Sequence, residues 1–364
     1  MKSVKGKKGC SPEVSSLQKL RAEEVVPGMK LGEDITASTG AVLMPAGSVL
    51  TEKAIESFVN WNVSEVRIID EEDEKIARRH ELEQQFMEKY NASVSNVMGL
   101  MERLEKEDEL DPEEARSISE DLSELTKDYS YIKLFSELEN KEQRTYQHSI
   151  NVGIYAAMLA RWLGFDNAVT RELVLTGVLH DIGKAKIDRE IFDKAKSFNE
   201  EAQKEIQKHP IYGFNIVNRQ TKFNYNVARG VLEHHERMTG TGYPEGKTGY
   251  QIHLHGKIVA VTNVFDHIVS DGDSNSSDGE YTFSDLDALA KNTDQFDITL
   301  TQTFTKHIYN IFIGSQVELS DERTGEIVMM NRDEITRPLV KLNDGEFIDL
   351  NKERSLVIKR ILKL

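Results

Sequence analysis

The sequence predicts a mainly α-helical protein with a small β-rich module before the helical part and a small β appendage after it. Beyond residue 71, apolar residues recur at three- and four-residue intervals, the period of an amphipathic helix. Short apolar runs broken by glycine and proline occur near residues 24–70 and 317–350, as in strands joined by turns. The expected divisions are a disordered tail (1–20), the β-rich module (21–70), a helical linker (71–142), a helical domain (143–303), and a C-terminal helix with the β appendage (304–364).

Composition limits the class of protein and its partners. The chain has 364 residues, 38% of them hydrophobic, which allows a sizeable core. Its 62 acidic against 46 basic residues give a net charge of −16, which opposes nonspecific binding to DNA, RNA or an anionic membrane. A single cysteine excludes an intramolecular disulfide and a cysteine-based zinc site, so the cytoplasm is the expected location.

No signal peptide and no membrane span are expected. The basic residues at the N-terminus are not followed by the apolar segment that a signal peptide requires. The most apolar stretches, 173–179 and 258–264, are far shorter than the roughly 20 residues that cross a bilayer.

The β-rich module is divided by turn residues, namely Pro27-Gly28, Thr39-Gly40 and Pro45-Ala46-Gly47. Within it, Thr51 can cap a helix that runs to Asn60, and the alternating residues 63–69 predict a closing strand. This module contains no catalytic constellation.

Two amphipathic helices are expected in the linker. The first has an apolar stripe at Phe86, Tyr90, Val94, Val97, Met101 and Leu104. The second begins with Asp111 as the cap and Pro112 at the first helical position. Its stripe is Ile118, Leu122, Leu125, Tyr129 and Ile132. The spacing fits either packing on the chain's own domain or a homodimer through the 86–132 helices, and base rates favour the first.

Residues 317–350 return to strand-like runs after the helical domain. These runs are divided at Arg323-Thr324-Gly325 and Asn343-Asp344-Gly345. A small β structure without a site is expected there.

The helical domain concentrates histidines within fewer than ninety residues, on predicted helices: His148, His180, His209, His234 and His235. A lone histidine is more commonly a core or surface residue. His180 and Asp181 are adjacent at the end of an apolar run, so an imidazole and a carboxylate lie side by side as possible metal ligands. His234 and His235 form a second adjacent pair of possible ligands. Imidazole with carboxylate suits first-row transition metals, and several ligand-bearing segments can hold two of them. Two ions about 3.5 to 4 Å apart can clamp both oxygens of a phosphoryl displacement.

Three short segments in this domain carry a family resemblance. They are HDIGK at 180–184, HHER at 234–237 and GTGYP at 240–244, together with His148 before them and His209-Pro210 between them. In order and spacing they resemble the HD-GYP family, over most of residues 144–270. HDIGK is shared with the wider HD phosphohydrolase superfamily, whereas HHER followed by GTGYP is specific to this branch.

The resemblance implies a helical HD-type domain that hydrolyses cyclic di-GMP to a linear dinucleotide or GMP through a metal-bridged hydroxide. It also implies two divalent transition metals, iron or manganese. The metal-ligand positions it assigns are His148, His180, Asp181, His209, His234, His235 and, at the last ligand position, Asn263.

The resemblance gives Lys184 a place facing the substrate phosphate and makes Asp181 and Lys184 the catalytic pair. A lysine one turn after Asp181 can neutralise charge on a phosphoryl oxygen, and the alternative is a surface salt bridge. Gly242, Tyr243 and Pro244 are expected to border the substrate in a tight loop.

The chain departs from the family pattern close to this site. Arg144 replaces a glutamate, and a cation at this position would repel a third metal ion instead of holding it. Asn263 replaces the last ligand aspartate in Ala260-Val-Thr-Asn263-Val-Phe-Asp266-His-Ile, where the family has a sequence like AVADVFDAL. Asp266 aligns with the family's second aspartate. It can replace the missing ligand carboxylate only if the helix rotates or the metal moves. The acidic, flexible segment 270–279 stands where the family has an Arg-Pro-Tyr-Arg run, and Thr239 replaces an aspartate.

These departures keep a second hypothesis open. In it, the chain is a catalytically impaired HD-GYP scaffold that acts as a cyclic dinucleotide sensor or a protein-interaction module. Hydrolysis of another phosphoester is a third alternative. Metal content separates the active enzyme from the impaired scaffold. An enzyme should retain close to two transition metals per chain, whereas a degenerate scaffold could retain one or none.

Overall fold

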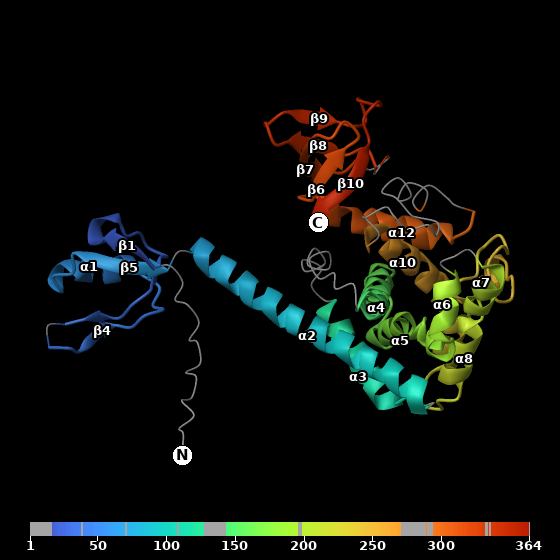
Figure 1. The fold of residues 1–364 in the computed structure, drawn as a ribbon. Coiled ribbons are helices and arrows are strands. Elements are labelled where there is room, and N and C mark those ends of the chain that lie inside the picture. Colours follow the sequence, from blue (N-terminus) through green and yellow to red (C-terminus); the bar gives the residue numbers. More distant parts are fainter. Residues whose placement is uncertain are drawn as a thin grey trace, which may run out of the picture. The chain divides into compact units, whose positions relative to one another are not determined.

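The computed structural model describes residues 17–37, 39–69, 71–107, 109–126, 143–195, 199–270, 289, 294–331, 334 and 336–363 (Figure 1). The chain divides into two compact units, 1–85 and 86–364. No helix of the described residues is long and apolar enough to cross a membrane.

The first unit contains a three-stranded sheet, a separate strand pair, the short 3-10 helix η1 (Ala22–Glu24), helix α1 (Glu52–Asn60) and the beginning of helix α2 (Glu71–Glu107). Strand β5 (Glu65–Ile69) lies between β1 (Leu17–Arg21) and β2 (Lys30–Leu31), antiparallel to both. Strands β3 (Ile35–Thr36) and β4 (Val42–Met44) form a separate pair. The prediction of a disordered tail over 1–20 is wrong for residues 17–20, because they pair with β5; the rest of the tail lies outside the described residues.

Helix α1 (Glu52–Asn60) begins as expected from its cap. The side chain of Thr51 accepts a hydrogen bond from the amide of Ala54, which satisfies a donor that the first helical turn leaves free. Phe58 of this helix is buried against the sheet residues Leu31, Val66 and Ile68. The predicted closing strand is present as β5, in which buried and exposed residues alternate.

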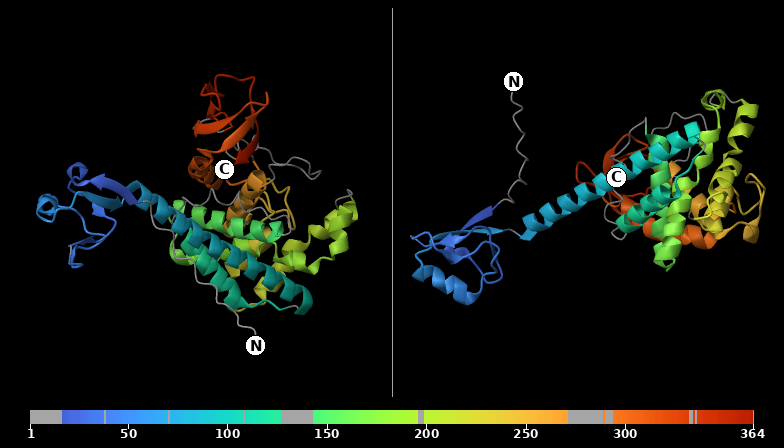
Figure 2. Two further views of the ribbon diagram at one scale, coloured as in Figure 1. Left: turned by 60° about the vertical axis from the view of Figure 1, so that its left-hand side comes forward. Right: turned by 90° about the horizontal axis from the view of Figure 1, so that it is seen from below.

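Helices α2 (Glu71–Glu107) and α3 (Pro112–Leu125) carry the two predicted apolar stripes. The side chain of Asp111 caps α3 by accepting from the amides of Glu113 and Glu114. From Phe86 onward the stripe residues are buried in the same hydrophobic core as α4 and α5, and Figure 2 shows these helices together. The predicted linker is therefore, over much of its length, part of the second unit's core. Tyr129 and Ile132 of the second stripe lie outside the described residues.

The rest of the helical part is a sequence of helices with short connections. Their bounds are α4 Arg144–Trp162, α5 Asn167–Leu179, η3 Ile182–Lys186, α6 Arg189–Ala195, α7 Glu200–Ile206, α8 His209–Asn218, α9 Tyr225–Glu233, η4 Gly249–Gln251, α10 Leu254–Ser270, α12 Ile298–Ile308 and η5 Tyr309–Phe312. Helices α4 and α5 approach closely at two glycines: a Cβ at Gly177 would lie 2.6 Å from the Cα of Gly153. Larger residues at this crossing would push the two helices apart.

A five-stranded antiparallel sheet follows in the order β10-β6-β7-β8-β9. The strands are β6 Gln316–Leu319, β7 Thr324–Met329, β8 Leu339–Leu342, β9 Phe347–Asp349 and β10 Ile358–Lys363. Its buried side chains belong to the same core as α12, and α12 crosses the predicted domain boundary at 303/304.

The two predicted turns of this sheet have different outcomes. The turn at Asn343-Asp344-Gly345 is confirmed, with Gly345 at φ +92°. The turn predicted at Arg323-Thr324-Gly325 is wrong in position, because Thr324 and Gly325 already belong to β7. A Cβ at Gly325 would lie 2.6 Å from the carbonyl oxygen of Lys341, so this glycine permits close strand approach instead of a turn.

Candidate metal centre

The clustered histidines come mainly from helix ends. His148 lies inside α4, whereas His180 and His234 are the C-terminal caps of α5 and α9. His209 is the first residue of α8, and His235 follows His234. The sequence placed all five on helices; the structure places most of them where a helix begins or ends.

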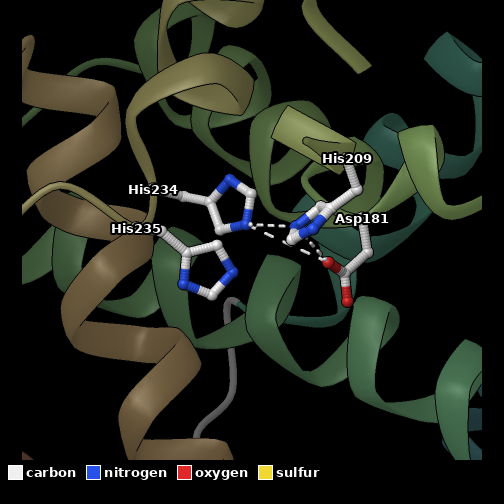
Figure 3. Close-up of side chains that lie close together, drawn as sticks. All are labelled: Asp181, His209, His234 and His235. Atoms are coloured by element: carbon white, nitrogen blue, oxygen red, sulfur yellow. Dashed lines mark hydrogen bonds and ion pairs between the residues drawn. The ribbon is translucent and has the colours of Figure 1, made fainter. Parts of the chain in front are cut away.

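The structure brings these side chains into two adjacent groups that share one carboxylate. One group consists of Asp181, His209, His234 and His235, shown in Figure 3, and the other of His148, His180 and Asp181. Within each group the potential ligand atoms lie within 4.8 Å of one another. Segments far apart in the sequence thus converge on a single place with Asp181 between the two groups.

Three of the imidazoles are held in the same way by helix-end carbonyls. Nδ1 of His180 donates to the carbonyl of Gly177 at 2.7 Å. In the same way, Nδ1 of His209 donates to the carbonyl of Ile206 at 2.8 Å, and Nδ1 of His234 to that of Val231 at 2.7 Å. These carbonyls belong to the last turns of α5, α7 and α9, where no further helical amide is available. Because each Nδ1 donates its proton there, each Nε2 carries a lone pair.

The resulting arrangement needs a cation. The Nε2 atoms of His209 and His234 lie 3.2 Å apart, so two lone pairs face each other in a buried place. Burial, followed by the charges of His180 and His209, holds the pKa of His234 well below its ordinary value. Protonating His234, so that its ring could donate a hydrogen bond to His209, is therefore disfavoured. A metal ion bound by these nitrogens would relieve the repulsion.

Asp181 is the ionised centre of the cluster. Its Oδ2 accepts from Nζ of Lys184 at 2.6 Å, and its Oδ1 lies 3.2 Å from Nε2 of His209 and 3.9 Å from that of His234. Burial alone would raise the pKa of this carboxyl, but His180 and Lys184 hold it well below its usual value. Asp181 is therefore a carboxylate that both donor groups can use.

Several buried polar atoms of the site have no hydrogen-bond partner among the described residues. They are Nε2 of His180, Oδ1 of Asp181, Oδ1 of Asn263 and Oδ1 of Asp266. Buried polar atoms without partners are costly, so a cluster of them at one place needs an explanation such as an ion. The donor set of nitrogens with one shared carboxylate fits a first-row transition metal.

Helix α10 supplies a carboxylate that orients His148. Oδ2 of Asp266 lies 2.6 Å from Nδ1 of His148, and both side chains are largely buried. Carboxylates commonly hold a metal-binding imidazole in this manner. Asp266 is thus engaged with a histidine and has not taken the place of Asn263.

Sequence reasoning missed His267 on the same helix. Its ring centroid lies 4.7 Å from that of His148, and burial, followed by His148 and Lys184, lowers its pKa to about 3. The available signal was its place one turn after Asn263, on the same helix face.

The GTGYP loop is fixed to the HHER segment by a buried glutamate. The carboxylate of Glu236 accepts from the amides of Glu245 at 2.7 Å and Lys247 at 2.9 Å. The ring of Tyr243 stacks on His235, with centroids 4.4 Å apart and planes at 18°. A Cβ at Gly242 would lie 2.5 Å from the amide nitrogen of Arg237, so only glycine permits this contact.

The remaining departures from the family pattern are placed as follows. Arg144 donates to the carbonyl of Ser270 at 3.2 Å, and the hydroxyls of Thr239 and Thr241 share a hydrogen bond of 2.9 Å. Nearly all of the acidic segment 270–279 lies outside the described residues.

Comparison with known proteins finds a matching family model and several related proteins. Residues 133–300 match the family model described as HD domain. Over 205 residues, 56% of this chain and 49% of the relative, the chain is 30% identical to the cyclic di-GMP phosphodiesterase PA4108 of Pseudomonas aeruginosa. It is 37% identical over 131 residues to 3'3'-cGAMP-specific phosphodiesterase 1 of Vibrio cholerae, covering 35% of this chain and 30% of that relative. The chain therefore spans about half the length, or less, of these relatives.

A solved structure, Bd1817, a HDG"Y"P protein from Bdellovibrio bacteriovorus, aligns with a TM-score of 0.49 at 16% identity, over 80% of this chain and 98% of that chain.

The fold and the cluster define a helical domain that gathers histidines and an aspartate for metal binding. HDIGK and HHER contribute to this cluster, and GTGYP contacts it through Tyr243. Residues 133–300 thus match the HD domain, and the HDIGK, HHER and GTGYP segments within them resemble its HD-GYP branch.

Proposed function

We propose that this chain is a phosphodiesterase that hydrolyses cyclic di-GMP to a linear dinucleotide or GMP. The observation that carries the proposal is the pair of donor groups sharing Asp181, with unprotonated ring nitrogens turned toward each other. A relative named for cyclic di-GMP and one named for 3'3'-cGAMP support a cyclic dinucleotide as the substrate class.

The centre is proposed to hold two divalent transition metals, iron or manganese. His209, His234 and His235 with Asp181 would hold one ion, and His148 and His180 with Asp181 the other. Asn263, whose buried Oδ1 has no hydrogen-bond partner among the described residues, is proposed as a further ligand. When bound, such ions supply Lewis-acid stabilisation of charge on the phosphoryl group and activation of the nucleophile.

Lys184 is proposed to contact the substrate phosphate. Its ammonium group is anchored on Oδ2 of Asp181, and its side chain is 30% exposed, so one side is accessible to a ligand. A cation fixed beside the reacting group stabilises developing negative charge without reorganisation. Tyr243, held by its stacking on His235, and its neighbours Gly242 and Pro244 would form the wall that bounds the nucleotide.

One observation favours the second candidate, an impaired scaffold that binds the dinucleotide without turnover. Asn263 contributes a neutral oxygen at a buried position where a carboxylate would balance the charge of two ions. With one ionised carboxylate shared by both groups, metal retention is weaker and the nucleophile less activated.

The deciding experiment measures metal and products together. The full chain, purified without oxygen and loaded with iron or manganese, is incubated with cyclic di-GMP and, separately, with 3'3'-cGAMP, and the products are resolved by chromatography. Two ions per chain with linear products support the enzyme. Dinucleotide binding without products supports the sensor, and neither binding nor products rejects both.

A further inference from the structure

Two buried glutamates flank the adjacent ligands His234 and His235. Glu236 holds the chain after GTGYP through two backbone amides, whereas Glu233 is the last residue of α9 and comes directly before His234. The side chain of Glu233 is 0% exposed. A buried carboxylate is costly unless cations and hydrogen-bond donors surround it, so the partners of Glu233 determine how this helix end is held.

Glu233 receives its donors from three segments of the chain. Arg229, one turn earlier in α9, pairs with Oε1, and the ammonium group of Lys247 donates to the same oxygen at 2.9 Å. Oε2 accepts from the backbone amide of His253, directly before α10. A Cβ at Gly256 would lie 2.8 Å from the Cβ of Glu233, so the start of α10 packs directly on this side chain. The carboxylate therefore joins the end of α9 to the start of α10.

Lys247 connects this helix end with the GTGYP loop. Its backbone amide donates to Oε2 of Glu236 at 2.9 Å, while its ammonium group binds Glu233. The same ammonium group pairs with the exposed carboxylate of Glu245. One residue thus binds both buried glutamates, and a substitution can separate the two contacts. Replacing the side chain of Lys247 leaves its amide, and the bond to Glu236, in place.

The orientation of two metal-binding rings depends on where α9 ends. His234 is the C-terminal cap of this helix, and the ring centroids of His234 and His235 lie 4.1 Å apart (Figure 3). Both rings belong to the His209 group, the four possible ligands Asp181, His209, His234 and His235, whose ligand atoms lie within 4.8 Å of one another. Such a group binds an ion well only if the backbone that carries the ligands is fixed.

We infer that Glu233 and Lys247 form a positioning pair for the His209 group, and that the pair acts by fixing the end of α9 against α10 and against the chain after GTGYP. This inference rests on the proposed metal centre. It separates the two buried glutamates by role, because Glu236 holds the loop that bounds the dinucleotide and Glu233 holds the ligands. The other donor group has no residue at this helix end, so its ion should be affected less.

The test removes the cation and keeps the stem of the side chain. Lys247→Met retains the backbone amide on Glu236, and Lys247→Arg restores a cation. Lys257→Met is the matched control, because Lys257 pairs with Asp297 at 3.2 Å, is 15% exposed against 17% for Lys247, and lies outside the contacts just described. Glu245→Gln tests the exposed partner of Lys247. Each full-length variant is loaded with cobalt. We then measure ions per chain, chelator-competition affinity, the visible absorption spectrum, the free energy of unfolding, and KM and kcat for cyclic di-GMP.

In Lys247→Met the affinity of one of the two ions should fall by about three- to tenfold, somewhat less than the roughly 10–100-fold loss typical when a direct outer partner of a ligand is removed. Its cobalt spectrum should change, and kcat should fall more than KM rises, because the loop stays attached to Glu236. Lys247→Arg should recover most of the affinity and the spectrum. Lys257→Met should lose a comparable free energy of unfolding, while its metal affinity, spectrum and kinetics match the parent.

Three results overturn the inference and are distinguishable. If Lys247→Met binds both ions and turns over like Lys257→Met, the pair only stabilises the fold, and the proposed function stands without it. If Glu245→Gln shows the same losses as Lys247→Met, the exposed partner carries the effect instead of Glu233. If the parent itself binds no metal, the proposed function fails and the inference fails with it. Should Lys247→Met not fold, Glu233→Gln takes its place with the same expected losses, since it keeps the size of the side chain and an acceptor oxygen for the amide of His253.

Discussion

At the scale of single residues, Asp181 is the group on which the whole centre depends. It is the shared member of both donor groups, it is held ionised, and its Oδ2 anchors Lys184. His180, by contrast, belongs to one group only. We therefore expect these two sequence neighbours to carry unequal shares of metal binding in the proposed centre.

Substitutions at 180, 181 and 184 should reveal these shares. Asp181→Ala should lose both ions, His180→Ala about one, and Lys184→Ala neither, because lysine is a phosphate contact in this scheme. Metal per chain after identical loading is the measurement. Equal metal content in the three variants would show that the roles are wrongly assigned.

Restoring a carboxylate on α10 should strengthen the centre. Asn263→Asp is expected to raise metal occupancy and cyclic di-GMP turnover, since a charged oxygen would then meet the ions in a buried place. The gain should be larger for manganese than for iron, because manganese favours carboxylate oxygen. Asn218→Asp, at an exposed position, controls for added charge alone. An unchanged occupancy in both metals would refute this expectation.

At the scale of elements, the site depends on helix ends and on one loop. The C-terminal turns of α5, α7 and α9 orient three imidazoles through carbonyls that the helices themselves cannot use. Helix η3 brings Asp181 near His209 because Gly183 and Gly213 allow close backbone contact between η3 and α8. The geometry of the centre is thus set by backbone packing as much as by the ligands.

A methyl group at Gly183 should disturb this packing. Its Cβ would lie 2.0 Å from the carbonyl oxygen of His209 and 2.4 Å from the amide of Gly213, both backbone atoms that cannot move aside. Gly183→Ala should cost about 3 kcal/mol or more in unfolding free energy and reduce metal occupancy. Gly99→Ala, in α2, meets only the end of Arg103 at 3.5 Å and should stabilise by about 0.5–1 kcal/mol. Denaturant unfolding and metal analysis check both.

The GTGYP loop should depend on Glu236 without affecting the metals directly. Glu236→Ala leaves the amides of Glu245 and Lys247 without their acceptor, at a cost of about 1–3 kcal/mol. We expect KM for the dinucleotide to rise more than kcat falls, with metal content retained. Glu245→Gln, which alters an exposed side chain of the same loop, should be close to the parent. Loss of metal in Glu236→Ala would contradict a role confined to the loop.

At the scale of the whole molecule, the helical unit begins earlier than the matched HD domain. Phe86, Tyr90 and Ile118 are buried in one core with α4 and α5, and the hydroxyl of Tyr90 donates to Asn151 at 2.8 Å. Because residues 86–125 of these helices use their apolar stripes internally, a homodimer through this part of 86–132 would need another surface. The homodimer and the cytoplasmic location stay predictions.

Truncation should locate the unit boundary. A fragment of residues 86–364 should unfold cooperatively and keep the parent's metal content. A fragment of 143–364 should not fold, because it lacks the buried side chains of α2 and α3. Calorimetry and metal analysis of the two fragments decide this, and a stable 143–364 fragment would restore the linker interpretation.

The sequence by itself determined the helical class, the two capped helices and the residue types of the centre. Local signals suffice for these: Thr51 and Asp111 act through their own first turns, and His180 and Asp181 are adjacent. Only the tertiary structure decided that Asp181 is shared by two groups, that Asp266 is engaged by His148, and that His267 lies beside it. These facts depend on how α4, α5, α8 and α10 pack, and long-range packing leaves no periodic trace in the sequence. Gly325 shows the same limit, since turns and close strand contacts both favour glycine.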